Sequence, residues 1–164
     1  MSDYTIRAIT DADREWVARF VTEQWGSDMM VMHGDVLYIS QQEGFLAEMD
    51  GYPVGLASYR IADGECEITS LDSLQKGLGI GSALIQLVRQ KAVEAGCRRL
   101  FLVTTNDNTY ALRFYQRRGF VLSALRRNAV SEARKIKPEI PLTGDDGIPI
   151  RDELELEMDL RSAS

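Results

Sequence analysis

Histidine and cysteine are nearly absent from this chain. His33 is the only histidine, and the only two cysteines, Cys66 and Cys97, lack C-x-x-C spacing. Zinc sites and the hydrolytic triads need several such residues, so we expect no metal site and no Ser-His or Cys-His catalysis. The two cysteines could form a disulfide, but we predict two free, mostly buried thiols.

Long apolar runs and an excess of positive charge are also missing. No uninterrupted apolar stretch approaches the roughly 18 residues of a membrane span, and residues 1–7 lack a basic segment followed by an apolar one. We therefore expect a cytoplasmic protein without a membrane partner. The net charge of −6 argues against nucleic acid, because neutralising phosphates requires a basic face. A polyanionic ligand would have to be held by local features.

The residues that are present indicate one globular domain over 1–164, since 45% of them are hydrophobic and no internal repeat appears. Alternation and turn residues predict strands at residues 4–9, 44–50, 52–62, 65–71 and 98–104, a further one opening at 120, and a last one over 154–160. Helices are predicted after Thr10, over 81–95 and from Asn108, and residues 126–137 have helical composition. Residues 26–42 read as irregular, and the carboxylates of the last strand read as its solvated face. This order is typical of an α+β, three-layer α/β/α fold with a mixed, mostly antiparallel twisted sheet of about seven strands flanked by helices.

The segment from Leu74 to Ser82 carries the strongest functional signal. Its three glycines permit positive φ and a close approach of main-chain N–H groups to a ligand, and the predicted helix adds its own free N–H groups and positive dipole end. Together they predict an anion site that binds a phosphate. A tight connection that holds no ligand would have a similar composition.

Two common phosphate motifs do not fit this loop. A P-loop needs Lys followed by Ser or Thr, and the dinucleotide fingerprint needs G-x-G-x-x-G with a later acidic residue. The loop resembles instead the Q/R-x-x-G-x-G/A element of the GNAT superfamily of N-acetyltransferases, with Lys76 in place of the usual Gln or Arg and Gly79 and Gly81 on the small positions. The resemblance implies acetyl-CoA as the bound co-substrate. The residues that it places on the diphosphate are Lys76, Gly77, Leu78, Gly79, Ile80, Gly81 and Ser82.

A second motif, Asn108-x-x-Ala111-x-x-x-Tyr115-x-x-x-Gly119-Phe120, resembles the GNAT signature of a helix along the pantetheine arm. The resemblance implies that Asn108 hydrogen-bonds the cofactor and that Tyr115 lies near its sulfur and protonates it. Two plainer interpretations remain open. Capping a helix is the commonest use of Asn at such a site, and a Tyr on the inner face of a helix is usually a core residue.

The implied reaction is transfer of acetyl to a primary amine of a small-molecule or peptide acceptor. Glu67 resembles the family's carboxylate that accepts the amine proton, while Glu65 on the same strand face is its rival and a plain surface carboxylate is the alternative. The main-chain N–H of Leu71 matches the position that binds the cofactor and stabilises the oxyanion. The family places the acceptor near residues 25–38 and 126–152. The latter hold a basic cluster that we interpret as a solvated helix face, with binding of an acidic acceptor group as the alternative: Arg126, Arg127, Arg134, Lys135 and Lys137.

Two other functions compete with the enzyme. A non-catalytic acyl-CoA binding or sensing module would keep the cofactor loop, but the presence of both Tyr115 and Glu67 favours catalysis. A nucleotide-binding α/β domain matches the loop poorly. The resemblance is also compatible with a homodimer.

Overall fold

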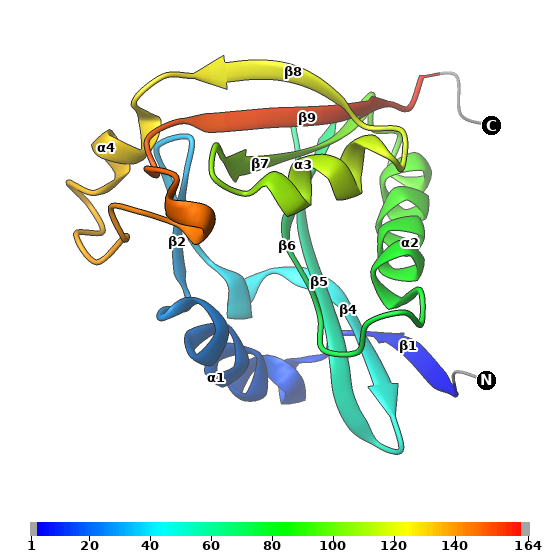
Figure 1. Ribbon diagram of the computed structural model, residues 1–164. Coiled ribbons are helices and arrows are strands. Elements are labelled where there is room, and N and C mark those ends of the chain that lie inside the picture. The colour runs from blue at the N-terminus through cyan, green and yellow to red at the C-terminus, as the bar shows by residue number, and fades with distance from the viewer. Residues whose placement is uncertain (1–2, 162–164) are drawn as a thin grey trace. The chain divides into compact units, whose positions relative to one another are not determined.

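The computed structural model describes residues 3–161 and contains a seven-stranded sheet flanked by helices (Figure 1). The strands are hydrogen-bonded in the order β1-β4-β5-β6-β7-β9-β8, and β2 and β3 form a separate two-stranded sheet. The strands are β1 (Tyr4–Ala8), β2 (Met29–Met32), β3 (Asp35–Tyr38), β4 (Glu43–Met49), β5 (Tyr52–Ala62), β6 (Glu65–Ser73), β7 (Arg99–Thr105), β8 (Val121–Arg126) and β9 (Glu153–Asp159). The α-helices are α1 (Arg14–Trp25), α2 (Ile80–Glu94), α3 (Thr109–Gln116) and α4 (Ala129–Ala133). The predicted α+β fold is confirmed.

The chain divides into two compact units. The first contains the chain up to Asp28, from Tyr38 to Leu100, and from Leu160 onward, and the second contains Met29–Leu37 and Phe101–Asp159. A single domain over residues 1–164 stays a prediction. No helix within residues 3–161 is both long and apolar enough to cross a membrane.

Two tight turns set the strand register of the first unit. Asp50 and Gly51 have φ of 52° and 79°, and Asp63 and Gly64 have φ of 55° and 76°. Two successive residues at positive φ match the twist of an antiparallel hairpin. The β4–β5 and β5–β6 hairpins predicted from these two dipeptides are confirmed.

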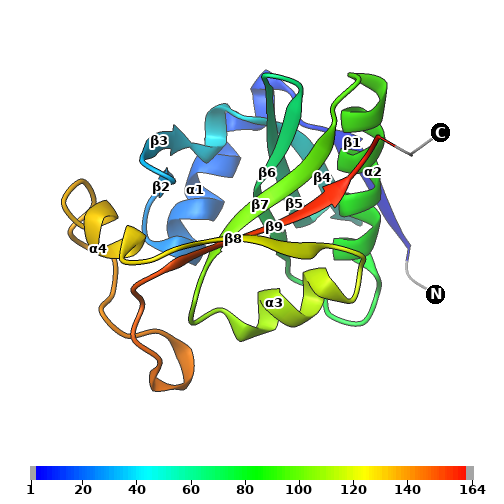
Figure 2. The same ribbon diagram turned by 90° about the horizontal axis from the view of Figure 1, so that it is seen from above.

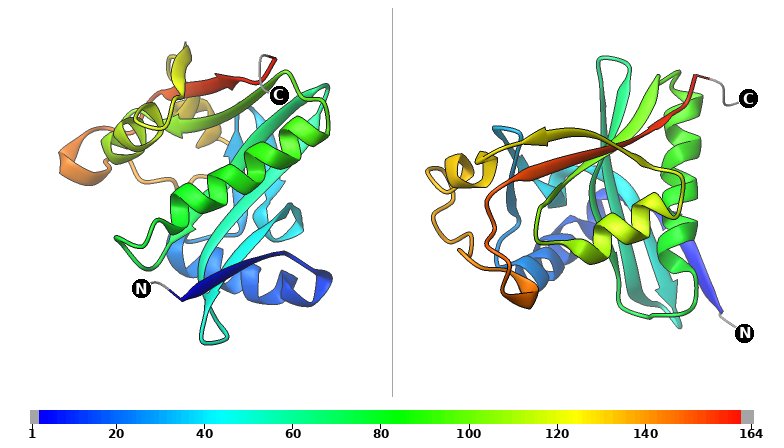
Figure 3. Two further views of the ribbon diagram at one scale, coloured as in Figure 1. Left: turned by 90° about the vertical axis from the view of Figure 1, so that its right-hand side faces the viewer. Right: turned by 45° about the horizontal axis from the view of Figure 1, so that its top comes forward.

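Helices cover both faces of the strands in the first unit (Figures 1 and 3). Helix α2 buries one stripe of apolar side chains, as an amphipathic helix does: Ile80, Leu84, Ile85, Val88 and Ala92. A Cβ built on Gly55 of β5 would lie 2.7 Å from Ile80 Cγ2, so only glycine permits this close approach of helix and strand. Helix α1 covers the other face and buries Val17, Phe20 and Val21.

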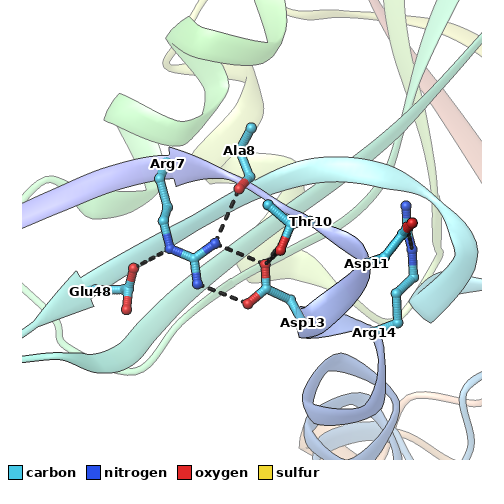
Figure 4. Close-up of polar contacts among 7 residues, drawn as sticks. All are labelled: Arg7, Ala8, Thr10, Asp11, Asp13, Arg14 and Glu48. Carbon is cyan, nitrogen blue, oxygen red and sulfur yellow. Dashed lines mark hydrogen bonds and ion pairs between the residues drawn. The ribbon is translucent and has the colours of Figure 1, made fainter.

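A charged cluster joins β1 to the start of α1 (Figure 4). The Arg7 guanidinium donates from both Nη atoms to the two carboxylate oxygens of Asp13 at 2.8 Å, and its Nε donates to Glu48 on β4. The main-chain N–H of Thr10 also donates to Asp13, at 2.7 Å, as the predicted helix start requires. These hydrogen bonds, with Arg7 first, hold the pKa of Asp13 well below its usual range.

Replacing Asp13 with Asn is expected to lower the free energy of unfolding near neutral pH by about 1–3 kcal/mol, because charge-assisted hydrogen bonds are lost. Since the folded-state pKa of Asp13 is depressed, its contribution is present above the unfolded value of about 3.9 and declines as the pH falls below it. Urea unfolding between pH 7 and pH 3 should therefore show a shallower pH dependence for the variant. Asp11→Asn, at a fully exposed carboxylate, is the control. Equal pH dependence of wild type and Asp13→Asn would contradict this account.

The second unit pairs β8 with β9, and α3 packs on β8 (Figure 2). The prediction that the carboxylates of the last strand are its solvated face is wrong for two of them. Glu153 and Glu155 are only 4% and 6% exposed. Ser123 Oγ and Arg126 Nη2 donate to Glu155 at 2.8 and 2.9 Å, so polar partners on β8 compensate its burial.

Two further segments differ from the sequence predictions. Residues 26–42 contain the β2–β3 hairpin, whose turn has positive φ at His33 and Gly34. The helical composition of residues 126–137 yields only the short helix α4. The connection after it is held by hydrogen bonds of Asn106, whose Oδ1 accepts from the main-chain N–H groups of Arg151 and Asp152, both at 2.9 Å.

Candidate functional site

The glycine loop adopts the open backbone that its sequence predicts. Gly77 and Gly79 have φ of 81° and 75°, and Gly79 is the N-cap of α2. Gly81 lies in the first turn of the helix without positive φ, so only two of the three glycines use this freedom. The helix also begins at Ile80, one residue earlier than predicted.

The surroundings of this loop are open and contain a positive charge. A Cβ added at Gly77 or Gly79 would meet no atom within 4 Å, so the space beside both residues is open. The first turn of α2 contains no acidic residue, and the Ala83 N–H donates to the Gly79 carbonyl at 3.0 Å. Main-chain N–H groups at the start of a helix can donate to a bound anion. Lys76 is exposed and adds a positive charge before the helix.

Strand β6 leads into this loop and carries Glu67. The register pairs Glu67 with Arg60 on β5, and Arg60 Nε donates to Glu67 Oε1 at 3.0 Å. Glu67 is 2% exposed, so the arginine compensates a buried carboxylate.

The pairing of β5 with β6 also fixes the face on which Asp72 lies. Gly55, which faces α2, pairs with Ser73. Alternation from Ser73 places Asp72 on the opposite face of β6, which α1 covers.

A β-bulge interrupts β6 between Glu67 and Leu71. Ser58 pairs with Ser70 and Tyr59 pairs with Ile68, which leaves Thr69 as the extra residue. Ser58 Oγ contacts Thr69 Oγ1 at 2.7 Å and Ser70 Oγ at 2.5 Å, so hydroxyl groups fill the bulge. Bulges re-aim the backbone of a strand and recur next to active sites. Leu71 follows this bulge and is paired with Ala57 of β5, and the role of its N–H stays a prediction.

Glu65, the rival of Glu67, has a different environment. It is 30% exposed at its side chain, and Arg99 donates to both of its carboxylate oxygens, at 2.9 and 3.2 Å. A further ion pair joins it to Arg98 at 3.6 Å. Glu65 thus links strands near the β5–β6 turn, whereas Glu67 is buried nearer the bulge. This comparison favours Glu67 as the base, which stays a prediction.

The second predicted set of site residues lies on α3 in the second unit. Asn108 is the N-cap of this helix, because its Oδ1 accepts from the Ala111 N–H at 3.1 Å, and its Nδ2 donates to Thr104 Oγ1 at 3.2 Å. The capping interpretation is therefore confirmed, and a cofactor contact stays a prediction. Tyr115 lies seven residues further along α3 and is 8% exposed, with its ring edge-to-face against Phe120.

The prediction that the basic cluster of residues 126–137 is a solvated helix face is wrong for Arg134 and Lys137. Lys137 is buried and donates from Nζ to the Met29 carbonyl at 2.7 Å, and this burial lowers its pKa. Arg134 donates to the carbonyl groups of Ile140 and Ile150, at 3.2 and 2.7 Å. These cations hold the long connection together, which removes most of the support for an acidic acceptor group binding there.

Both cysteines are free and buried, as predicted. Burial raises the pKa of Cys66 to about 12, so its thiol is not a nucleophile near neutral pH. Within residues 3–161, no three His, Cys, Asp or Glu side chains are grouped as metal ligands.

The sequence analysis missed Arg60, Ser58 and Asp72. Arg60 and Ser58 could have been predicted to face β6, because the Asp63-Gly64 hairpin turn fixes which residues of β5 oppose β6.

Comparisons with known proteins agree with the motifs. Residues 10–120 match the model of the acetyltransferase (GNAT) family. The uncharacterized protein YxbD of Bacillus subtilis (strain 168) is 42% identical over 149 residues, which cover 90% of this chain and 94% of that protein. The uncharacterized protein YdhI of the same strain is 43% identical over 136 residues, covering 82% and 85%.

Solved structures share the fold. A GNAT family acetyltransferase from Elizabethkingia anophelis with acetyl-CoA bound has a TM-score of 0.71 and 22% identity, covering 98% of this chain and all of the other.

Proposed function

Because the chain belongs to the acetyltransferase (GNAT) family, we propose that it transfers an acetyl group from acetyl-CoA to a primary amine by direct attack in a ternary complex. The observation that carries the proposal is the glycine loop, with its open space beside Gly77 and Gly79 at the start of α2. The similar protein from Elizabethkingia anophelis, which has acetyl-CoA bound, supports the choice of ligand.

The loop from Lys76 to Ser82 is proposed to hold the diphosphate of coenzyme A, and Asn108 to contact its pantetheine arm. Main-chain N–H groups and a helix N-terminus suit a phosphate, and they explain how a protein of net charge −6 could bind a polyanion. Acetyl-CoA supplies an activated thioester carbonyl, so no covalent intermediate on the protein is needed.

The protein's own groups then have to transfer protons and stabilise the oxyanion. An alkyl ammonium with a pKa of about 10 must lose a proton before it attacks, and Glu67 is proposed to accept it, directly or through water. The N–H of Leu71 is proposed to stabilise the oxyanion. The new C–N bond forms as the C–S bond breaks. The nitrogen loses two protons in all. One proton ends on the sulfur, delivered by Tyr115, and the other is released to solvent.

Tyr115→Phe is expected to lower kcat by about 100-fold while changing acetyl-CoA affinity little, because only the departing thiolate loses its acid. Steady-state kinetics and calorimetry on the same preparation would measure the two effects. Tyr110→Phe is the matched control, because Tyr110 lies on the same helix and is 63% exposed. A Tyr115→Phe variant that turns over at the wild-type rate would remove this residue from the mechanism.

The proposed activity itself is tested by a mass-spectrometric screen for acetylation. Purified protein and acetyl-CoA would be incubated with polyamines, aminoglycosides, amino acids and peptides. We expect a mass increase of one acetyl group on at least one amine class. Acetyl-CoA binding without acetylation of any amine would favour the non-catalytic acyl-CoA module instead.

A further inference from the structure

Asp72 is a partly buried carboxylate near the end of β6. Among residues 3–161 its side chain forms no ion pair, and its hydrogen-bond donor is the indole Nε1 of Trp25, 3.4 Å from Oδ2. The other carboxylates of β6 differ, since Glu67 is paired with Arg60 and Glu65 with Arg99. Burial, opposed in part by the Trp25 hydrogen bond, raises the pKa of Asp72.

The surroundings of Asp72 favour a positive charge. Trp25, whose indole contacts the carboxylate, is the last residue of α1, where the negative end of the helix dipole lies. The last turn of α1 contains no basic residue that would neutralise it. The Trp25 side chain is 52% exposed and offers an aromatic ring, a surface that attracts cations. The carboxylate is therefore in contact with an indole from the end of a helix, and residues 3–161 supply no cation to it.

This place lies on the same face of β6 as Glu67. Asp72 pairs with Leu56 and Glu67 with Arg60, and the β-bulge at Thr69 lies between them. Asp72 is five positions after Glu67, and one of the four residues between them is in the bulge, so four strand steps remain, roughly 13 Å. An acceptor of several carbons could extend from the reacting amine to Asp72.

We propose that Asp72 and Trp25 bind a second cationic group of the acceptor, and that the acceptors of this protein are therefore diamines or polyamines. The inference rests on the proposed acetyl transfer. Asp72 fixes which amine compounds bind and in which orientation, while Glu67 accepts the proton of the nitrogen that reacts. An acceptor with one amine and a neutral end would leave Asp72 without its ion pair.

The test compares diamines with amino alcohols of equal length. Acetylation of 1,4-diaminobutane and 1,8-diaminooctane would be measured against 4-amino-1-butanol and 8-amino-1-octanol. For the wild type, we expect kcat/KM to be about tenfold higher or more for the better diamine than for its amino alcohol. Asp72→Asn should lower the diamine value by roughly 10- to 100-fold and leave the amino alcohol value within about twofold, because one charge-assisted contact is lost.

Two more variants separate charge recognition from structural damage. Asp50→Asn removes the same charge from an exposed turn whose positive φ suits Asn. It should change kcat/KM neither for the diamines nor for the amino alcohols. Trp25→Leu removes the aromatic ring and should also weaken diamines selectively. It tests the same site if Asp72→Asn proves unstable in thermal unfolding.

Failure of this inference and failure of the proposed function give different results. Acetylation of both compound types with no selective effect of Asp72→Asn or Trp25→Leu would overturn the inference and leave the acetyltransferase intact. An equal decrease of kcat/KM for diamines and amino alcohols in these variants would also overturn the inference. If no amine is acetylated, the inference is tested by binding instead. Calorimetry would then measure the binding of both diamines to the protein loaded with coenzyme A. Binding that requires Asp72 would support the cation site without catalysis, and absence of such binding would overturn it.

Discussion

Glu67→Gln is expected to lower kcat/KM for amine acetylation at pH 7 by about 1000-fold, within the range that general base catalysis contributes. Gln preserves the size of the side chain and its ability to accept from Arg60, 3.0 Å away, but it cannot take a proton. Because an alkyl amine deprotonates by itself near pH 10, the deficit should shrink as the pH rises toward that value. A pH–rate profile from pH 6 to pH 10 would show both effects, and the acidic limb should flatten in the variant.

Glu65→Gln is the control for this experiment. Glu65 lies on the same strand face but is held by Arg99 and Arg98 near the β5–β6 turn, so its replacement should affect stability more than rate. Thermal unfolding of both variants would reveal any structural loss. A wild-type rate in Glu67→Gln, or a large loss in Glu65→Gln alone, would contradict the assignment of the base.

Gly79→Leu is expected to weaken acetyl-CoA binding by about 100-fold or more. Gly79 has φ of 75°, and the space where its Cβ would lie is empty of protein atoms. A side chain there would occupy the space proposed for the diphosphate, and several charge-assisted hydrogen bonds would be lost together. Isothermal titration calorimetry with acetyl-CoA measures the change directly.

The chain contains a closely matched control at the other end of the same helix. Gly96 follows α2, has φ of 74°, and likewise has no protein atom within 4 Å of a built Cβ. Gly96→Leu carries the same backbone strain, about 1–2 kcal/mol, without touching the loop. Equal weakening of acetyl-CoA binding by both variants would mean that strain, and not obstruction of a ligand site, explains the effect.

Much of the first unit could be predicted from local sequence. The Asp-Gly dipeptides at 50–51 and 63–64 require positive φ, and this requirement sets the turns and hence the register of three strands. The same register implies the pairing of Arg60 with Glu67, which the sequence analysis did not derive. The bulge at Thr69 could not be predicted, because nothing in the residues of β6 marks which one is left without a partner.

The burial of charged residues in the second unit could not be predicted from alternation. Glu155 looks like a solvent-facing residue of an amphipathic strand, yet partners on β8 allow it to be buried. Lys137 looks like part of a solvated helix, yet it donates to a carbonyl of β2, more than 100 residues earlier. Such partners come from distant segments, and a pattern within one segment carries no information about them.

A crystal structure of the protein with acetyl-CoA would test the central claim most directly. The account predicts diphosphate oxygens within about 2.7–3.2 Å of main-chain nitrogen atoms between Lys76 and Ser82. A loop that stays empty, or coenzyme A bound elsewhere while this loop is filled by the protein's own side chains, would contradict it.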